Sequence, residues 1–152
     1  MINSEEHFNH IAEDYDYWKN HNRYYYKNLF KLYRSLISPG SSVIEIGCGT
    51  GDILAQLDPR EGKGIDVSDE MIHIAQKKHS TLTSIRFERE DIVASKEPFH
   101  AEYVFLADVL EHVDKLPEFL NTLSQRIRPL TVVIISVANP RWEWLLMFAE
   151  RF

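Results

Sequence analysis

The stretch from Val43 to Asp52, Val-Ile-Glu-Ile-Gly-Cys-Gly-Thr-Gly-Asp, constrains the fold more than any other part of the chain. A strand-like run rich in β-branched residues leads into three glycines, and a helical pattern begins directly behind them at Asp52. Glycine tolerates positive φ and has no Cβ, so the backbone can turn tightly and approach a ligand closely. The sequence therefore predicts a strand, a glycine loop and a helix whose first N–H groups face a bound molecule.

The spacing of the glycines separates three kinds of glycine loop. A phosphate-binding P-loop requires Gly-Lys-Ser/Thr after a four-residue gap, and Asp52 stands where the second glycine belongs. The dinucleotide pattern G-x-G-x-x-G/A fits Gly47 and Gly49 but requires Gly or Ala at position 52. Carboxylates at Asp52 and Glu45 would repel a pyrophosphate. These residues favour a ligand that has a positive portion and no phosphate.

Three segments carry a resemblance to a known family. The pattern E-x-G-x-G-x-G, which begins at Glu45, resembles the first motif of class I S-adenosylmethionine-dependent methyltransferases. The segment 64–71 resembles the ribose-binding strand of that family, and 8–16 is similar to the F-x-x-x-A-x-x-Y-D lead-in that closes over the cofactor in many small-molecule members. The overall arrangement resembles bacterial methyltransferases found alongside glycosyltransferases.

The resemblance implies that S-adenosylmethionine is the cofactor and S-adenosylhomocysteine the product. It places Tyr15 at the methionyl carboxylate, and Asp91 with Ile92 at the adenine. Asp66 follows Gly47 by 19 residues, at a strand end where a carboxylate can accept both ribose hydroxyls. Cys48 is either an activated thiolate at a helix start or a small residue that fits a tight loop. The expected cofactor-binding residues are Tyr15, Glu45, Gly47, Cys48, Gly49, Gly51, Asp66, Val67, Met71, Asp91, Ile92 and Ala107.

Apolar runs alternate with helical patterns along the whole chain, which predicts an α/β, doubly wound, mostly parallel sheet. We expect buried strands at 43–46, 63–67, 103–107 and 132–137, and a strand near an edge at 85–90. The predicted helices cover 4–14, 21–37, 52–57, 115–128 and 141–152, with another capped by Ser68. The Rossmann-like methyltransferase fold implied by the resemblance has the strand order 3-2-1-4-5.

The chain is expected to form a single methyltransferase domain over 1–152. Its parts are N-terminal lid helices at 1–37, a cofactor-binding core at 41–138 and a C-terminal helix at 141–152. The family's sheet has seven strands, and this pattern ends after five, so the C-terminal hairpin is missing. An apolar edge strand beside an apolar helix predicts either a truncated longer protein or a homodimer that associates through the fifth strand and this helix.

The bulk properties exclude some function classes. The net charge of −6 argues against a dedicated nucleic-acid binder. Only Cys48 could form a disulfide, so none is internal, and no apolar run reaches the ~18 residues of a membrane span. A cytoplasmic location is expected. One basic stripe, built from Lys19, Arg23, Lys27, Lys31 and Arg34, is predicted on a single helical face, either as a solvated surface or to attract an anionic acceptor.

Methyl transfer from a sulfonium depends mainly on alignment, but a hydroxyl acceptor also needs a base. Asp108, Glu111 and His112 follow the fourth expected strand, and His112 is the candidate catalytic residue. The same three residues resemble the E-x-x-E-H metal ligands of some ubiquinone-pathway and small-RNA O-methyltransferases, in which Mg²⁺ or Zn²⁺ would acidify a vicinal diol. Asp replaces the first Glu here and no histidine follows His112, so no metal site enters the main interpretation.

The sequence thus predicts an S-adenosylmethionine-dependent methyltransferase acting on a small-molecule or sugar/glycolipid acceptor. Three alternatives stay open. The chain could bind the cofactor without turnover, as a fragment or regulatory domain. It could be a metal-assisted O-methyltransferase, or an NAD-dependent oxidoreductase.

Overall fold

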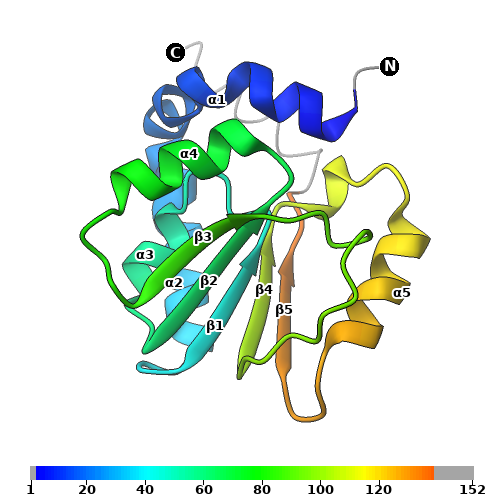
Figure 1. Ribbon diagram of the computed structural model, residues 1–152. Helices are drawn as coiled ribbons and strands as arrows, with labels where there is room; N and C mark the ends of the chain where they lie inside the picture. Colours follow the sequence, from blue (N-terminus) through cyan, green and yellow to red (C-terminus); the bar gives the residue numbers. More distant parts are fainter. Residues whose placement is uncertain (1–2, 139–152) are drawn as a thin grey trace.

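In the computed structural model, which describes residues 3–138, the chain forms one parallel sheet with helices on both faces (Figure 1). The strands are β1 (Ser42–Ile46), β2 (Glu61–Asp66), β3 (Ile85–Arg89), β4 (Tyr103–Ala107) and β5 (Val132–Ser136). They lie in the order β3-β2-β1-β4-β5, and each neighbouring pair is parallel. The predicted fold class and strand order are confirmed.

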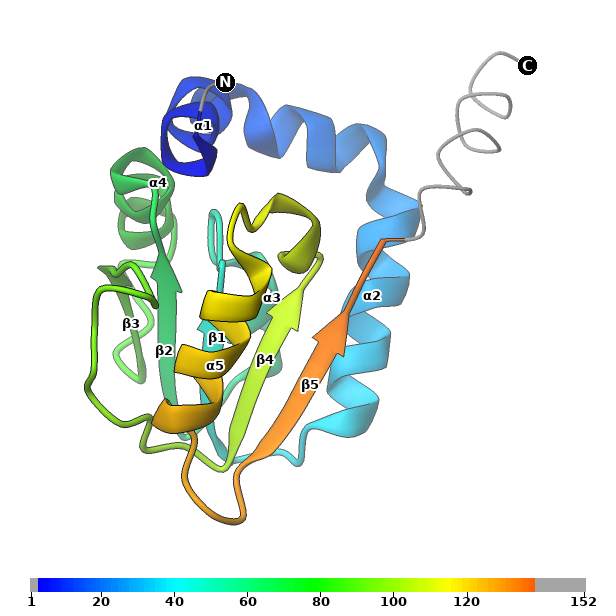
Figure 2. The same ribbon diagram turned by 90° about the vertical axis from the view of Figure 1, so that its right-hand side faces the viewer.

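The helical segments of the described region connect the strands and cover the sheet. They are α1 (Ser4–His21), α2 (Arg23–Leu36), α3 (Asp52–Leu57), α4 (Asp69–Lys78), the 3-10 turn η1 (Leu110–His112) and α5 (Leu116–Arg126). Figures 1 and 2 show α1 running across the end of the sheet toward which the strands point. None of these described helices is both long and apolar enough to cross a bilayer.

Successive side chains of β1 point to opposite faces of the sheet, and the core accordingly has two layers. Val43 faces the side covered by α2, α3 and α4, whereas Ile44 and Ile46 face α5 and the segment that follows β3. The buried residues of the first layer are Leu29, Tyr33, Ile37, Val43, Cys48, Leu54, Ile72, Ala75, Phe87 and Phe105. Those of the second are Ile44, Ile46, Ile65, Ile92, Phe99, Val104, Leu106, Phe119 and Leu123. The central strands β1 and β4 are therefore buried on both faces.

The first helix is longer than predicted. We expected it over 4–14, but α1 has 18 residues and continues to His21. No Gly or Pro interrupts it, and ion pairs from Asp16 and Lys19 attach it to α4 and α3. Asn22 then separates α1 from α2. The predicted basic stripe is correct only in part. Lys19 lies on α1 and does not belong to it, whereas Arg23, Lys27, Lys31 and Arg34 are exposed on α2 at helical spacing.

The C-terminal half also differs from expectation. We predicted β5 as buried, but Val132 and Ile135 are 49% and 41% exposed, because β5 pairs on one side only, with β4, in the described region. On α5, Phe119 and Leu123 are buried, whereas Leu116 and Leu120 are 36% and 39% exposed. The helix predicted at 141–152 lies outside the described residues.

Candidate functional site

A cavity of about 390 Å³ lies at the carboxyl ends of the strands and is lined on one side by residues of α1. We call it the strand-end cavity. In open parallel sheets this is where ligands bind, and the volume falls in the range of small-molecule sites, roughly 300–1,000 Å³. The expected cofactor residues that line it are Tyr15, Gly47, Gly49, Asp66, Val67, Met71, Asp91, Ile92 and Ala107. His112 and Asp108 line it as well.

The glycine loop between β1 and α3 forms the floor of the strand-end cavity. Gly47 has a φ of 70°, and an added Cβ there would lie 2.5 Å from Cγ2 of Val109. The N–H groups of Gly47 and Cys48 both donate to the carbonyl of Ile65, at 2.8 and 3.0 Å. The loop is thereby fixed on β2, and it needs glycine for both conformation and space.

Asp66 ends β2 and connects the loop to the next helix. Its carboxylate accepts hydrogen bonds from the backbone N–H of Gly49 at 2.9 Å and from that of Ser68 at 3.0 Å. Burial raises the pKa of Asp66, while these N–H groups act in the opposite direction. A carboxylate has about four acceptor positions, so Asp66, which lines the cavity, can still accept from a ligand.

Three of the expected residues do not line the cavity. Glu45 is 2% exposed, lies beneath α3 and accepts from the N–H of Leu54 at 3.2 Å. Burial raises the pKa of Glu45 to about 8, so its side chain is mostly neutral at pH 7. Cys48 is buried, and burial raises the pKa of its thiol, which is the opposite of an activated thiolate. Gly51 caps α3 with a φ of 80°. These residues support the loop from below.

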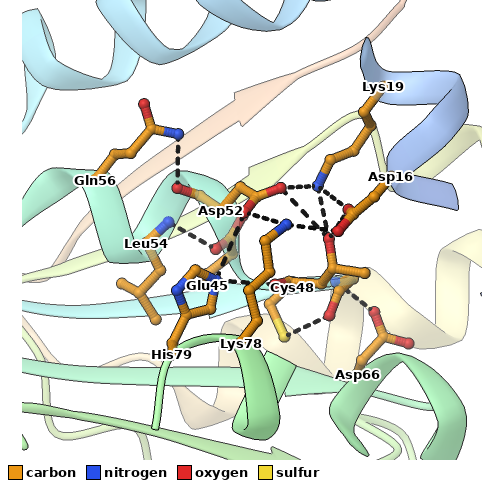
Figure 3. A network of polar contacts seen from close by, with 12 residues as sticks. Asp16, Lys19, Glu45, Cys48, Asp52, Leu54, Gln56, Asp66, Lys78 and His79 are labelled. Carbon is orange, nitrogen blue, oxygen red and sulfur yellow. Dashed lines mark hydrogen bonds and ion pairs between the residues drawn. The ribbon is translucent and has the colours of Figure 1, made fainter. Parts of the chain in front are cut away.

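We expected the carboxylate of Asp52 to lie close to the bound ligand, but Asp52 does not line the cavity. Figure 3 shows its carboxylate between Lys19 of α1 and Lys78 of α4. Lys78 lies 2.7 Å from Asp52 and 2.6 Å from Asp16, and Lys19 donates to the hydroxyl of Thr50 at 2.7 Å. Burial alone would raise the pKa of Asp52, but Lys19 and Lys78 lower it overall. This cluster joins α1, α3 and α4. Because Lys19 and Lys78 neutralise the charge of Asp52, our argument that this carboxylate would repel a pyrophosphate was wrong.

The N-terminal half of α1 forms the roof of the cavity. The hydroxyl of Ser4 donates to the carbonyl of His112, and the ring of Phe8 packs edge-on against the His112 ring at 5.1 Å. Asn9 accepts from the Ser68 hydroxyl at 2.6 Å. Tyr15 lies over the loop, where an added Cβ on Gly49 would be 3.3 Å from its ring. Burial raises the pKa of Tyr15, so its hydroxyl stays protonated.

One wall of the cavity depends on a residue that the sequence did not single out. Arg126, at the end of α5, is 3% exposed. Its guanidinium donates to the carbonyl of Glu97 at 2.7 Å, to that of Ile92 at 3.3 Å and to the Glu90 carboxylate. It also lies 3.9 Å from the centre of the Phe99 ring. Arg126 thus holds the segment that supplies Asp91 and Ile92, and only the tertiary fold reveals this.

The residues of the D-x-x-E-H pattern do not come together as metal ligands. Asp108 accepts from the hydroxyls of Tyr25 and Ser136, and Glu111 accepts from the N–H of Ala138. Among residues 3–138, no group of three or more His, Cys, Asp or Glu side chains is arranged to hold a metal ion. These three residues do not share one regular helix, because Asp108 takes a positive φ of 55° before η1 begins.

Comparison with known proteins gives one family match. The family described as "Methyltransferase domain" matches residues 17–151. The mitochondrial ubiquinone biosynthesis O-methyltransferase of Schizosaccharomyces pombe is 28% identical over 156 residues, which cover 91% of this chain and 56% of that protein. The ubiquinone biosynthesis O-methyltransferase of Yersinia pestis is 30% identical over 112 residues, covering 68% and 46%. The chain therefore spans about half the length of these relatives.

Solved structures share the fold at low sequence identity. The N-methyltransferase NodS from Bradyrhizobium japonicum, in complex with S-adenosyl-L-homocysteine, superposes with a TM-score of 0.74 at 18% identity and covers 88% of this chain and 72% of that one. A complex of DhpI with S-adenosylhomocysteine gives a TM-score of 0.72 at 23% identity, covering 86% and 65%.

Proposed function

The chain belongs to the methyltransferase domain family, and from that premise we propose that it binds S-adenosylmethionine in the strand-end cavity and transfers the methyl group to a small acceptor molecule. One observation carries the proposal. Residues from α1, the glycine loop and the ends of β2, β3 and β4 converge on a single cavity, although they are far apart in sequence. The complexes of NodS and DhpI with S-adenosylhomocysteine, on the same fold, support this choice of ligand.

The chain's own residues take distinct roles in this proposal. Asp66 accepts the ribose hydroxyls with the acceptor positions that its backbone partners leave. Asp91 and Ile92 meet the adenine, Met71 and Val67 flank the nucleoside, and Tyr15 faces the methionyl end. The bound cofactor supplies an activated methyl group, and the protein aligns it in a cavity closed by α1.

For the methyl acceptor we propose only a chemical class. The curated relatives are named for O-methylation in ubiquinone biosynthesis, which favours a hydroxyl acceptor. A small molecule or a sugar or glycolipid fits that chemistry. His112 lines the cavity beside Phe8, and we propose it as the base that takes the hydroxyl proton.

Calorimetry with S-adenosylhomocysteine tests the binding site. We expect Asp66→Ala to lose about 10- to 100-fold in affinity, because hydrogen bonds to a charged group contribute about 1.5–3 kcal/mol. Asp69→Ala is the matched control, since the Asp69 side chain is 69% exposed and starts α4 without lining the cavity. Absence of binding to the folded wild-type protein, or equal affinity in both variants, would reject the site.

A second candidate is a binding module without turnover. The chain spans about half the length of the relatives that it matches, so turnover has to be tested on this chain itself. Formation of S-adenosylhomocysteine from S-adenosylmethionine with a panel of hydroxyl acceptors separates the two. Turnover by the wild type that is lost in His112→Asn supports the enzyme, whereas tight cofactor binding without turnover supports the module.

Two further proposals concern self-association and the cellular location of the protein. The exposed edge of β5 would allow two copies to associate, and sedimentation velocity tests this. We propose a cytoplasmic location, which fractionation would test, although the relative from S. pombe is named as mitochondrial.

A further inference from the structure

Asp108 has a backbone conformation that a non-glycine residue rarely adopts. It directly follows β4 and has a φ of 55°. Three described non-glycine residues have positive φ, namely Asp58, Asp108 and Leu130, and of these Asp108 lines the strand-end cavity. Such a conformation is unfavourable for a non-glycine residue and persists only where the surroundings fix it.

Hydroxyl groups from two other elements fix Asp108. Tyr25 of α2 donates to one carboxylate oxygen, and Ser136 of β5 donates to the other at 2.9 Å. The N–H of Asp108 donates to the carbonyl of Ser136 at 3.3 Å. Tyr33 in turn donates to the Ser136 hydroxyl at 3.0 Å. A carboxylate has about four acceptor positions, so roughly two are left for a ligand.

The charges around the cavity are predominantly negative. The carboxylates that line it belong to Glu5, Asp66, Glu90, Asp91, Asp108, Asp114 and Glu118. Glu5, Glu90 and Glu118 have basic partners, whereas no Lys or Arg among residues 3–138 pairs with Asp108 within 4.0 Å. Lys115 is the single lysine that lines the cavity in the described part of the chain, and its side chain is 78% exposed.

An anion in this cavity would face these carboxylates. Like charges in close contact repel strongly near a protein surface, because the effective dielectric constant there is well below that of water. A hydroxyl or ammonium group instead donates a hydrogen bond to a carboxylate, which is about twice as strong as one between neutral groups. The side of the cavity at Asp108 therefore selects for hydrogen-bond donors.

We infer that Asp108 binds the methyl acceptor and that it selects a neutral hydroxyl compound or an amine cation over an anion. The inference rests on the proposed function, because it places the acceptor beside the cofactor in the same cavity. Asp108 acts here as a specificity-determining residue, held in its strained conformation by Tyr25 and Ser136. It differs from the alternative of an anionic acceptor attracted by the basic residues of α2, and the two predict opposite preferences for charge.

Three probes with one dihydroxyphenyl ring test this selection. Catechol is neutral at pH 7, dopamine is a cation and 3,4-dihydroxybenzoate is an anion. Calorimetry on protein saturated with S-adenosylhomocysteine gives the affinity for each. We expect dopamine to bind about tenfold or more tightly than the benzoate, and this ratio to fall about tenfold in Asp108→Asn, since each tenfold step is about 1.4 kcal/mol.

Matched variants separate recognition from folding. Asparagine tolerates positive φ, so Asp108→Asn preserves the backbone, and unchanged affinity for S-adenosylhomocysteine verifies its fold. Asp58→Asn is the control, because Asp58 has a φ of 50° and does not line the cavity. It should leave the ratio unchanged, whereas Tyr25→Phe should lower it partly.

The outcomes distinguish this inference from the proposed function. Failure of the wild type to bind S-adenosylhomocysteine removes the proposed function itself. Three other results, each obtained with cofactor binding intact, overturn only the inference. They are equal binding of dopamine and the benzoate, an unchanged ratio in Asp108→Asn, and absence of dopamine binding at millimolar concentration.

Discussion

The carboxylate of Asp66 accepts a hydrogen bond from the backbone N–H of Gly49 at 2.9 Å, so the end of β2 directly holds the glycine loop that follows β1. The same carboxylate accepts from Ser68, at the start of α4. The residue proposed to bind ribose is thus also the residue that orders the loop beside it. Ligand affinity and loop order are therefore coupled.

Asp66→Ala should loosen the loop even without ligand. The N–H groups of Gly49 and Ser68 lose their acceptor, so we expect their amide hydrogens to exchange at least about tenfold faster, for a loss of 1.4 kcal/mol or more. Hydrogen exchange followed by NMR measures this. The amide of Ile37, which donates to Tyr33 in another part of the fold, is an internal reference. Unchanged protection at Gly49 would contradict the coupling.

Gly51 and Gly40 separate the conformational and steric demands on glycine. Both have positive φ, 80° and 72°, but an added Cβ at Gly51 would lie 2.6 Å from the Phe87 ring, and at Gly40 it meets nothing within 4 Å. Gly40→Ala should cost about 1–2 kcal/mol of the free energy of unfolding. Gly51→Ala should cost about 1–3 kcal/mol more, because Phe87 must move. Urea denaturation compares the two, and equal losses would show that Phe87 yields freely.

Lys19 links α1 to the remainder of the ion cluster. Lys19→Met removes a cation whose side chain is 14% exposed and leaves Asp52 with Lys78. We expect a loss of about 1–3 kcal/mol in the free energy of unfolding, between the values for surface and buried pairs. Lys31→Met, on the exposed face of α2, should cost little. A double-mutant cycle with Asp52→Asn isolates the pair, and a coupling energy near zero would reject the link.

The raised pKa of Glu45 should make the free energy of unfolding depend on pH. Its pKa rises from the ordinary 4.5 to about 8 on folding, so within this window the folded protein holds a proton that the unfolded chain releases. Stability should fall as pH rises from 5 to 8, by up to about 1.4 kcal/mol per pH unit from this group. Glu45→Gln should flatten this slope in denaturation curves.

Glu102 is the control for this experiment. Hydrogen bonds from Ser42 lower its pKa, so its contribution is present above pH 4.5 and is lost only as the pH falls below that value. Glu102→Gln should therefore leave the slope between pH 5 and 8 unchanged. A slope that persists in Glu45→Gln would mean that another group carries it.

Arg126 should affect ligand binding without touching the ligand. Arg126→Met removes the donors to Ile92 and Glu97, so we expect about tenfold weaker binding of S-adenosylhomocysteine, a change of about 1.4 kcal/mol. Arg126→Lys retains the charge near Glu90 and should recover part of the loss. Arg86→Met, at an exposed position on β3, is the control. Full affinity in folded Arg126→Met would show that the wall holds its position without the guanidinium.

The sequence by itself determined the order of elements and the type of loop. Glycine positions, β-branched runs and helix caps act over a few residues, so Gly47, Gly49 and Gly51 were found in a strand-to-helix turn as predicted. The parallel sheet followed from the same local patterns, since strands that alternate with helices pair in parallel. The carboxylate at Asp66 could be placed at a strand end for the same reason.

Only the tertiary structure decided which polar side chains reach the cavity. Glu45, Asp52 and Asp66 lie within 22 residues of one another and carry the same chemical group, yet one is buried beneath α3, one is paired with lysines and one lines the cavity. Their environments come from α1, α3 and α4, which no local pattern specifies. The burial of charge and the pairing of ions depend on chain segments far apart in sequence, so the roles of Asp108 and Arg126 emerged only from the packed fold.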